Sequence, residues 1–472
     1  MEMAARSRMA NTLAATHPYT YLPLTNRKKT RQINAASAPP KPHERNTVNT
    51  RRQFLQATAA AVASPILLIN DAKAFGPRKK LRMAVVTTLW TRGTHSWHMS
   101  TRFLWGYPKE GSWHDTRFEV VSAYVDQQPD GDMSVSHSKE FGFPIYPTVA
   151  EALRCGSDEL AVDAVLLIGE HGVYPTNDIG QKLYPRYELF KQITDVYKKD
   201  GKTAPVFNDK HLSWNFAYAK EMVDESNELG FALQAGSSLP VTWRMPSVEM
   251  PYGAKIDEAL GVAMGPIDIY DFHALEMMQS MIERRAGGET GVSSVQGMRG
   301  DAVWQALAKP KWDEGGIDPE LFEACLSRSQ TLAQQNNLSH RYPTIAQMKE
   351  MVNEPIAYRI QYRDGTKSTM MLMNGLVGDF NFSAKLKGTG EVISTLFYLP
   401  PNPNVVYSAA LMDNAEQMFL SGKSTYPIER TLLTSGLVQS CMTSLANNQQ
   451  QMNTPHLDVN YKATRRSTFW HK

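Results

Sequence analysis

Residues 161–170, AVDAVLLIGE, form a run that is apolar apart from Asp163 and that ends in Gly169 and Glu170. A run of β-branched and aliphatic residues without polar alternation is typical of a strand that is covered on both faces, as in a parallel sheet. The residues that follow predict a helix over 185–201 and a second strand over 204–209, APVFND. A strand, a helix and a strand at this spacing indicate a βαβ unit.

The same alternation extends on both sides of this unit. Residues 81–90 and 118–127 predict two earlier strands, and 231–236 predicts a later one. Between them, 213–230 predicts a helix with Ser213 as its N-cap and Gly230 as its stop. We therefore expect a Rossmann-like parallel sheet over 75–236, in which ligands bind beyond the carboxyl ends of the strands.

The pattern changes after residue 236. Helices are predicted over 270–286, 319–334 and 344–352, and the segments between them alternate like antiparallel strands. Asp364-Gly365 marks a hairpin turn. We expect a second domain of the α+β type with a largely antiparallel open sheet over 237–450, and a tail over 451–472.

Charge and cysteine content exclude several classes of protein. The formal charge of +3 comes from residues 1–74, which hold 11 basic and 3 acidic side chains and leave 39 basic against 44 acidic in the remainder. No basic surface for nucleic acid is therefore expected. The three cysteines, Cys155, Cys325 and Cys441, lie far apart without metal-ligand spacing, so neither a disulfide scaffold nor a zinc ribbon is predicted.

The beginning of the chain has the features of an export signal. Residues 1–49 have the composition of a disordered leader. Residues 50–74 contain Arg51-Arg52, a mildly apolar stretch of 13 residues over 57–69 and the small-x-small triplet 72–74, and so resemble a twin-arginine signal peptide. Because a spanning helix needs about 20 apolar residues, we expect export without stable membrane insertion, through the twin-arginine machinery to the periplasm. An anchored or buried helix is the alternative.

Two motifs carry a resemblance to a known family. Asn208-Asp209-Lys210-His211 ends a strand before a helix, and His273-Ala274-Leu275 opens a helix in the second domain. With the late helix around 426–448, these stretches resemble the glucose-fructose oxidoreductase and inositol dehydrogenase family (Gfo/Idh/MocA) over roughly residues 81–450. The resemblance implies a Rossmann domain joined to an α/β domain with a large open sheet, which often forms oligomer interfaces.

The resemblance also implies the catalytic pair Lys210 and His273. Oxidation of a sugar carbinol needs a group that takes the hydroxyl proton, which histidine does well, and an ammonium that stabilises negative charge on oxygen. The family has an acid four residues before the histidine, but Ile269 stands there in this chain, and Asp268 is the plausible partner. The alternative is that Lys210 is a solvated strand end, that His273 is hydrogen-bonded to the main chain, and that Asp268 is a helix cap.

The resemblance implies NAD or NADP as cofactor, but the first turn departs from the dinucleotide pattern. That pattern has closely spaced glycines that let the backbone approach the diphosphate at a helix N-terminus. Residues 85–99, VVTTLWTRGTHSWHM, offer only Gly93. We expect Arg92, Gly93, Thr94 and backbone amides to meet the phosphates, and Asp126 to hold ribose hydroxyls, as the family's acid does there.

Further polar residues are candidates for ligand binding in the same crevice. Glu170 and His171 follow a strand and could contact the nicotinamide ribose or the substrate, or form only a turn. Arg244 lies where the family receives polyol hydroxyls, with a surface arginine as the alternative. His95, His98 and His114 lack a clear set of further ligands, so no metal site is predicted. SGKST at 421–425 lacks the required earlier glycine and is not a phosphate loop.

The sequence thus predicts an exported NAD(P)-dependent oxidoreductase acting on a sugar or cyclic polyol, with a tightly held cofactor. The alternative is a non-catalytic carbohydrate- or partner-binding protein that has lost the dinucleotide.

Overall fold

The computed structural model describes residues 79–400 and 405–471, which belong to one compact unit, Gly76–Lys472. The predicted leader and twin-arginine segment, residues 1–74, lie outside the described residues. Within the described part of the chain, no helix is long and apolar enough to cross a membrane.

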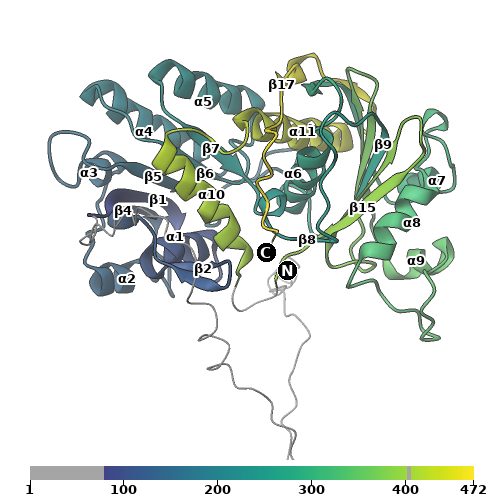
Figure 1. The fold of residues 1–472 in the computed structure, drawn as a ribbon, viewed down its shortest axis with the longest axis horizontal. Coiled ribbons are helices and arrows are strands. Elements are labelled where there is room, and N and C mark those ends of the chain that lie inside the picture. Colours follow the sequence, from purple (N-terminus) through teal and green to yellow (C-terminus); the bar gives the residue numbers. More distant parts are fainter. Residues whose placement is uncertain (1–78, 401–404, 472) are drawn as a thin grey trace, which may run out of the picture. The chain divides into compact units, whose positions relative to one another are not determined.

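The first half of this unit is a five-stranded sheet in the order β4-β1-β5-β6-β7, and every pair is parallel (Figure 1). All five residues of β5 are buried, because helices cover both faces. The strands are β1 (Leu81–Leu89), β4 (Phe118–Gln127), β5 (Ala164–Ile168), β6 (Val206–Asp209) and β7 (Leu233–Gly236). The helices are α1 (His95–Trp105), α2 (Ser134–Phe141), α3 (Val149–Arg154), α4 (Arg186–Asp200) and α5 (Phe216–Leu229).

Local chemistry explains where α4 and α5 end. Gly201 and Gly230 both take left-handed backbone angles at the C-caps, where a side chain would be strained. At the start of α5 the predicted N-cap was wrong. Asn215, not Ser213, accepts the hydrogen bond from Ala217 N, and Ser213 Oγ accepts one from Asn215 N, so it supports the cap from outside the helix.

The second half is an eight-stranded sheet in the order β16-β11-β12-β13-β9-β14-β15-β8. All its pairs are antiparallel except β13 with β9, so the prediction of a largely antiparallel sheet is confirmed. Asp364-Gly365 forms the predicted hairpin between β12 and β13, where Asp364 accepts a hydrogen bond from Thr366 N. The strands are β8 (Arg244–Met245), β9 (Ile256–Ala263), β11 (Val292–Arg299), β12 (Ile356–Tyr362), β13 (Lys367–Leu372), β14 (Phe380–Leu386), β15 (Val392–Phe397) and β16 (Met452–Asn453).

Helices cover both faces of this sheet. α6 packs on β9 and α11 packs on β11, whereas α8 packs on β9, β14 and β15. Two small two-stranded sheets are also present. One is the hairpin of β2 (Tyr107–Lys109) with β3 (Ser112–His114), and the other pairs β10 (Glu289–Thr290) with β17 (Asn460–Tyr461) from near the end of the chain. The remaining helices are α6 (Tyr270–Ile282), α7 (Asp301–Leu307), α8 (Pro319–Arg328), α9 (Ile345–Met351), α10 (Tyr407–Ser421) and α11 (Ile428–Ala446).

The chain returns to the parallel sheet after the second sheet is complete. Figure 1 shows α10 among the elements of the first sheet, and its buried residues share an apolar core with β1, α1 and β4. α11 contacts α5 and β7 on one side and α6 and β11 on the other. A second apolar core therefore runs without interruption from α4 and α5 to the large sheet.

Candidate functional site

A cavity of about 150 Å³ lies at the carboxyl ends of the parallel strands. Lys210 and Ser237 come directly after β6 and β7, and His95 begins the helix after β1. α6 contributes Tyr270 and His273 from its first turn. The lining polar and aromatic residues are His95, His98, His171, Asp209, Lys210, Ser237, Ser238, Tyr270, His273, Phe380 and Tyr407.

Lys210 is buried at this cavity and is held by a network of charges. Its Nζ lies 3.0 Å from Oε1 of Glu170, whose other oxygen accepts from Arg186. Arg186 in turn lies 3.0 Å from Nε2 of His211. Burial raises the pKa of Glu170, but Lys210 and Arg186 outweigh it and hold that pKa well below its usual range. The carboxylate is therefore charged, and it fixes the ammonium in place.

His273 lines the same cavity, and one hydrogen bond holds its ring. Its Nδ1 lies 2.6 Å from the Ser237 hydroxyl. Burial and then the nearby Lys210 lower the pKa of His273 well below its ordinary value. The imidazole is therefore neutral near pH 7 and able to accept a proton. Lys210 and His273, the predicted pair, thus lie at one cavity.

His95 and Asp209 form a second pair at this cavity, which the sequence analysis did not assign. Nδ1 of His95 lies 2.7 Å from Oδ2 of Asp209. Burial and Lys210 lower the pKa of His95 well below its usual value, whereas burial and then Glu170 raise that of Asp209 to about 7. Asp209 stands directly before Lys210 in the sequence, and that adjacency was the signal available for finding it.

Glu170, His171 and Asp268 lie near each other but have different roles. Glu170 holds Lys210, whereas His171 itself lines the cavity, with a left-handed backbone at φ 71°. Asp268 lies outside the lining and accepts a hydrogen bond of 2.6 Å from the backbone N of Lys182. Burial raises the pKa of Asp268 to about 7. The structure thus places Asp268 beside the start of α6, where it fixes a loop.

The structure does not bring Arg244 or Asp126 to the cavity. Arg244 is buried between the rings of Phe397 and Phe469, and its Nη atoms donate to the carbonyls of Val248 and Pro240. Asp126 lies at the end of β4 and accepts from the hydroxyls of Tyr124 and Tyr174 at 2.9 and 2.6 Å. Both carboxylate oxygens that would meet ribose hydroxyls are therefore engaged by tyrosines.

A larger, open cavity of about 1130 Å³ adjoins the small one. The two share five lining residues, His95, His98, His171, Tyr270 and Tyr407. The larger cavity also reaches the first turn, with Arg92 and Gly93, and several aromatic side chains of α1 and the β2-β3 hairpin, Trp97, Trp105 and Trp113. Arg92 and Gly93 of the first turn and Lys210 at the strand ends therefore line adjoining cavities.

The first turn fits phosphate oxygens by charge and space rather than by glycine pattern. Thr94 closes the turn on the Thr91 carbonyl through its backbone N, at 3.2 Å, and its hydroxyl, at 2.6 Å. Gly93 has a φ of 85°, and open space lies where a side chain would stand. Exposed Arg92 and the N-terminus of α1 face the open cavity from this turn, and both favour anions.

A polyhydroxyl ligand is favoured by two buried atoms of the small cavity's lining. Within the described residues, Oδ1 of Asp209 and Nε2 of His171 have no hydrogen-bond partner. Buried polar atoms are nearly always hydrogen-bonded, so each calls for a partner that the chain does not supply. Hydroxyl groups can donate to the carboxylate and either donate to or accept from the imidazole.

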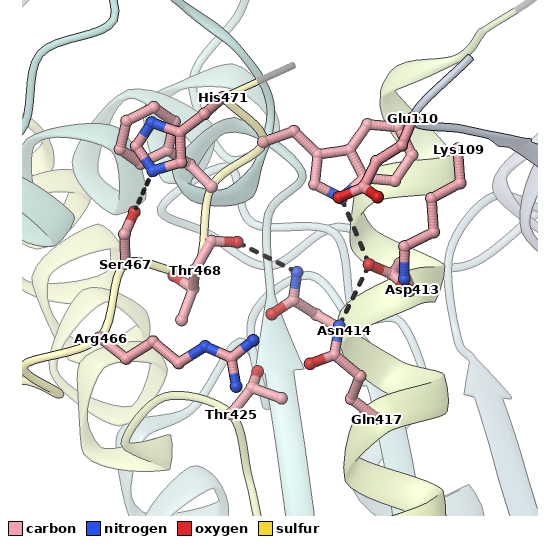
Figure 2. Close-up of a pocket in the computed structure, with 12 residues that line it drawn as sticks. Lys109, Glu110, Asp413, Asn414, Gln417, Thr425, Arg466, Ser467, Thr468 and His471 are labelled. Atoms are coloured by element: carbon pink, nitrogen blue, oxygen red, sulfur yellow. Dashed lines mark hydrogen bonds and ion pairs between the residues drawn. The ribbon is translucent and has the colours of Figure 1, made fainter. Parts of the chain in front are cut away.

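A metal site and a separate cavity are two further candidates among the described residues. Nowhere in 79–400 and 405–471 do three or more His, Cys, Asp or Glu residues form a group able to hold a metal ion. A separate cavity of about 400 Å³ lies between α10 and the C-terminal segment, and Figure 2 shows Arg466 and Asn414 turned toward it. None of the site residues predicted from the sequence lines that cavity.

Comparisons with known proteins give structural likeness at low identity. No family model matches the chain, and no curated protein matches it. GenD2 from gentamicin A biosynthesis, in complex with NAD, is similar with a TM-score of 0.49 and 12% identity over 79% of this chain and 96% of that one. A myo-inositol 2-dehydrogenase from Lactobacillus plantarum is similar with a TM-score of 0.45 and 12% identity over 79% and 99%.

A probable dehydrogenase from Thermotoga maritima has a TM-score of 0.48 and 13% identity over 80% of this chain and 100% of that one. The fold assignment itself stands on the strand order of this chain.

Proposed function

We propose that this protein is an NAD(P)-dependent oxidoreductase that oxidises a hydroxyl group of a sugar or cyclic polyol. One observation carries the proposal: a buried ammonium, Lys210, and a neutral imidazole, His273, line one small cavity at the carboxyl ends of a parallel sheet. Perturbed acid-base groups gathered in a cleft at this edge of an α/β sheet are typical of an active site.

The side chains divide the reaction between them. His273 takes the hydroxyl proton, and Ser237 holds the ring in position through Nδ1. Lys210 stabilises the negative charge that develops on the substrate oxygen, as a fixed cation does in a site shielded from water. Glu170 and Arg186 keep Lys210 from moving.

The size of the small cavity limits what enters it. A cavity of about 150 Å³ holds one six-membered ring, as shown by benzene bound in an engineered cavity of that volume. The substrate ring would fill it, and the cofactor would lie in the open cavity, with its phosphates near Arg92, Gly93 and Thr94. When bound, NAD or NADP would supply the hydride acceptor.

The decisive experiment measures the cofactor directly. The full chain is purified and denatured, and the supernatant is assayed for NAD and NADP by absorbance and by enzymatic cycling; the protein is also titrated with each nucleotide by calorimetry. Bound or titratable NAD(P), together with reduction of the nucleotide on adding myo-inositol or glucose, is the expected result. Arg92→Glu should weaken nucleotide binding at least tenfold, whereas Arg465→Glu, an exposed arginine remote from the cavity, should leave it unchanged.

A specific observation favours the second candidate, a carbohydrate- or partner-binding protein without dinucleotide. The first turn holds one glycine, and Tyr124 and Tyr174 occupy Asp126. That candidate is supported if neither nucleotide is released or bound while a sugar or cyclitol still raises the melting temperature.

We also propose export by the twin-arginine route to the periplasm, supported by Arg51-Arg52 and the apolar stretch that follows. Outside the cytoplasm no nucleotide pool replenishes the cofactor, so a tightly held cofactor that is reoxidised within the site would be required. Replacing Arg51 and Arg52 with lysines should retain the protein in the cytoplasmic fraction.

A further inference from the structure

Two of the four histidines that line the small cavity, His95 and His273, are each held by a partner from a different part of the fold. His95 comes from α1 and bonds through Nδ1 to Asp209 at the end of β6. His273 comes from α6 and bonds through Nδ1 to Ser237 after β7. In the described part of the chain, Nε2 of neither ring has a hydrogen-bond partner. Each ring therefore keeps one nitrogen available to a ligand.

The proposed oxidation uses only one of these two imidazoles. A hydroxyl proton needs one acceptor, which is His273, and the His95–Asp209 pair is left without a role. A buried histidine and aspartate are costly to place in a cavity without function. The His95–Asp209 pair is therefore placed to serve a second proton transfer on the ring of the same bound substrate.

We propose that the small cavity also catalyses proton exchange and inversion at a carbon next to a carbonyl group in a ring ketone, with His95 and His273 as its two acid-base groups. The ligand class is a keto sugar or keto cyclitol. This activity requires no cofactor and is independent of whether the chain binds NAD(P).

The step balances without an oxidant. His273 removes the proton from the carbon, the carbon–hydrogen electron pair forms the carbon–carbon double bond of an enolate, and negative charge moves to the oxygen beside Lys210. His95 then donates a proton from Nε2 to the other face of the same carbon. Its Nδ1 takes up the proton held by Asp209, so the carbon loses one proton and gains one. Solvent exchange returns His273 and Asp209 to their starting states.

The surroundings of His95 are consistent with this assignment. The raised pKa of Asp209 keeps a proton available near neutral pH. Lys210 lies at the same wall of the cavity and is held by Glu170, so the enolate oxygen has a fixed cation. Two bases on different elements allow removal and return of the proton from different directions, which a single base does not.

The test uses two ring ketones, 2-keto-myo-inositol and methyl 3-keto-α-D-glucopyranoside, as probes in D2O. The full chain is first freed of nucleotide, which absorbance verifies. Proton NMR follows loss of the signals next to the carbonyl and the appearance of the inverted product. The wild-type protein should exchange these protons at least tenfold faster than buffer containing an equal concentration of imidazole. The inverted product should carry deuterium.

The variants separate the two roles. His95→Gln should lose formation of the inverted product at least tenfold while keeping exchange with retained configuration. His273→Gln should lose both, and His340→Gln, a control at an exposed histidine, should match the wild type. Asp209→Asn preserves the shape of the side chain and should reproduce the His95→Gln result. It provides the test if His95→Gln does not fold.

Two outcomes would overturn the inference. One is wild-type exchange no faster than the imidazole buffer with both probes. The other is inversion by folded His95→Gln and Asp209→Asn at the wild-type rate. A parallel assay of NAD(P) reduction distinguishes the two proposals. Proton exchange without NAD(P) reduction contradicts only the proposed oxidoreductase activity, and NAD(P) reduction without proton exchange contradicts only the proposed inversion.

Discussion

The His273 imidazole depends on its surroundings for its charge state, and the Lys210 ammonium is part of those surroundings. Lys210 is paired with Glu170 in a network that includes Arg186 and His211, so its cation lies where water is scarce. The same cation, after burial, lowers the pKa of His273. Burial and this cation together therefore favour the neutral form of His273, which is the form that accepts a proton.

His273→Ala should abolish turnover of any substrate of the site, by at least a hundredfold, because general-base contributions are on the order of 10²–10⁴. The ring packs beside the cavity and has one hydrogen bond, so the melting temperature should change by only a few degrees. Steady-state kinetics and thermal unfolding, with His340→Ala as control, check this. A collapsed fold in the variant would show that His273 is structural.

The sequence identified the residue types of the site, but not all of its geometry. Lys210 and His273 were assigned through resemblance, and the structure brings them to one cavity. Arg244 is the first residue of β8, and it stacks on Phe469 from the far end of the chain. No local pattern around Arg244 could reveal a ring more than two hundred residues away.

At the scale of elements, close approach between helices and the large sheet fixes where α6 and α11 lie. Gly297 on β11 faces α11 so closely that a Cβ would lie 2.7 Å from the Cys441 carbonyl oxygen. A backbone atom cannot move aside cheaply, so the helix would have to shift. A glycine within a strand weakens it unless something approaches closely, and here the backbone of α11 does.

Gly297→Ala should lower the free energy of unfolding by about 1–3 kcal/mol, the usual cost of overpacking a core. Gly378 is the matched control, because a Cβ there meets Thr331 at an ordinary 3.5 Å. Urea unfolding of both variants measures the difference. Equal free energies of unfolding for the two variants would show that α11 shifts at little cost.

β9 has a buried carboxyl group whose titration affects stability. Burial, and then Asp318, raises the pKa of Glu258 to about 7 from an ordinary value of 4.5. The folded state therefore keeps a proton that the unfolded chain releases between about pH 4.5 and 7. This contribution is fully present below pH 4.5 and is lost as pH rises through 7.

Glu258→Gln should accordingly be no more stable than the wild type at pH 5 but more stable at pH 8, by up to about 3 kcal/mol, at roughly 1.4 kcal/mol per pKa unit. Urea titrations at the two pH values test this. Glu119→Gln, at an exposed position on β4, is the control and should show no such pH dependence.

At the scale of the whole molecule, buried ion pairs join parts of the chain that are far apart in sequence. Arg430 at the start of α11 binds Glu283, just after α6, through two hydrogen bonds of 2.9 and 2.5 Å. The hydroxyl of Tyr461 donates to the same carboxylate at 2.9 Å. Because α11 also contacts α5 and β7, this pair fixes the helix that spans both sheets.

Arg430→Met should destabilise the protein by about 3–5 kcal/mol, because it leaves the buried Glu283 carboxylate without its cation. The double variant Arg430→Met/Glu283→Gln should recover more than half of that loss. A double-mutant cycle by chemical unfolding measures both values. Additive losses would contradict a direct pair.

The sequence by itself determined the two kinds of sheet, because the period of apolar residues is a local property: the buried run of β5 and the Asp364-Gly365 hairpin are both encoded by neighbouring residues. Only the tertiary structure decided which side chains share a cavity. His95, Asp209 and Ser237 lie on three segments, and their meeting depends on strand order and on α6 packing against the ends of those strands. Contacts between distant segments arise from packing of the whole chain, and no short stretch of residues encodes them.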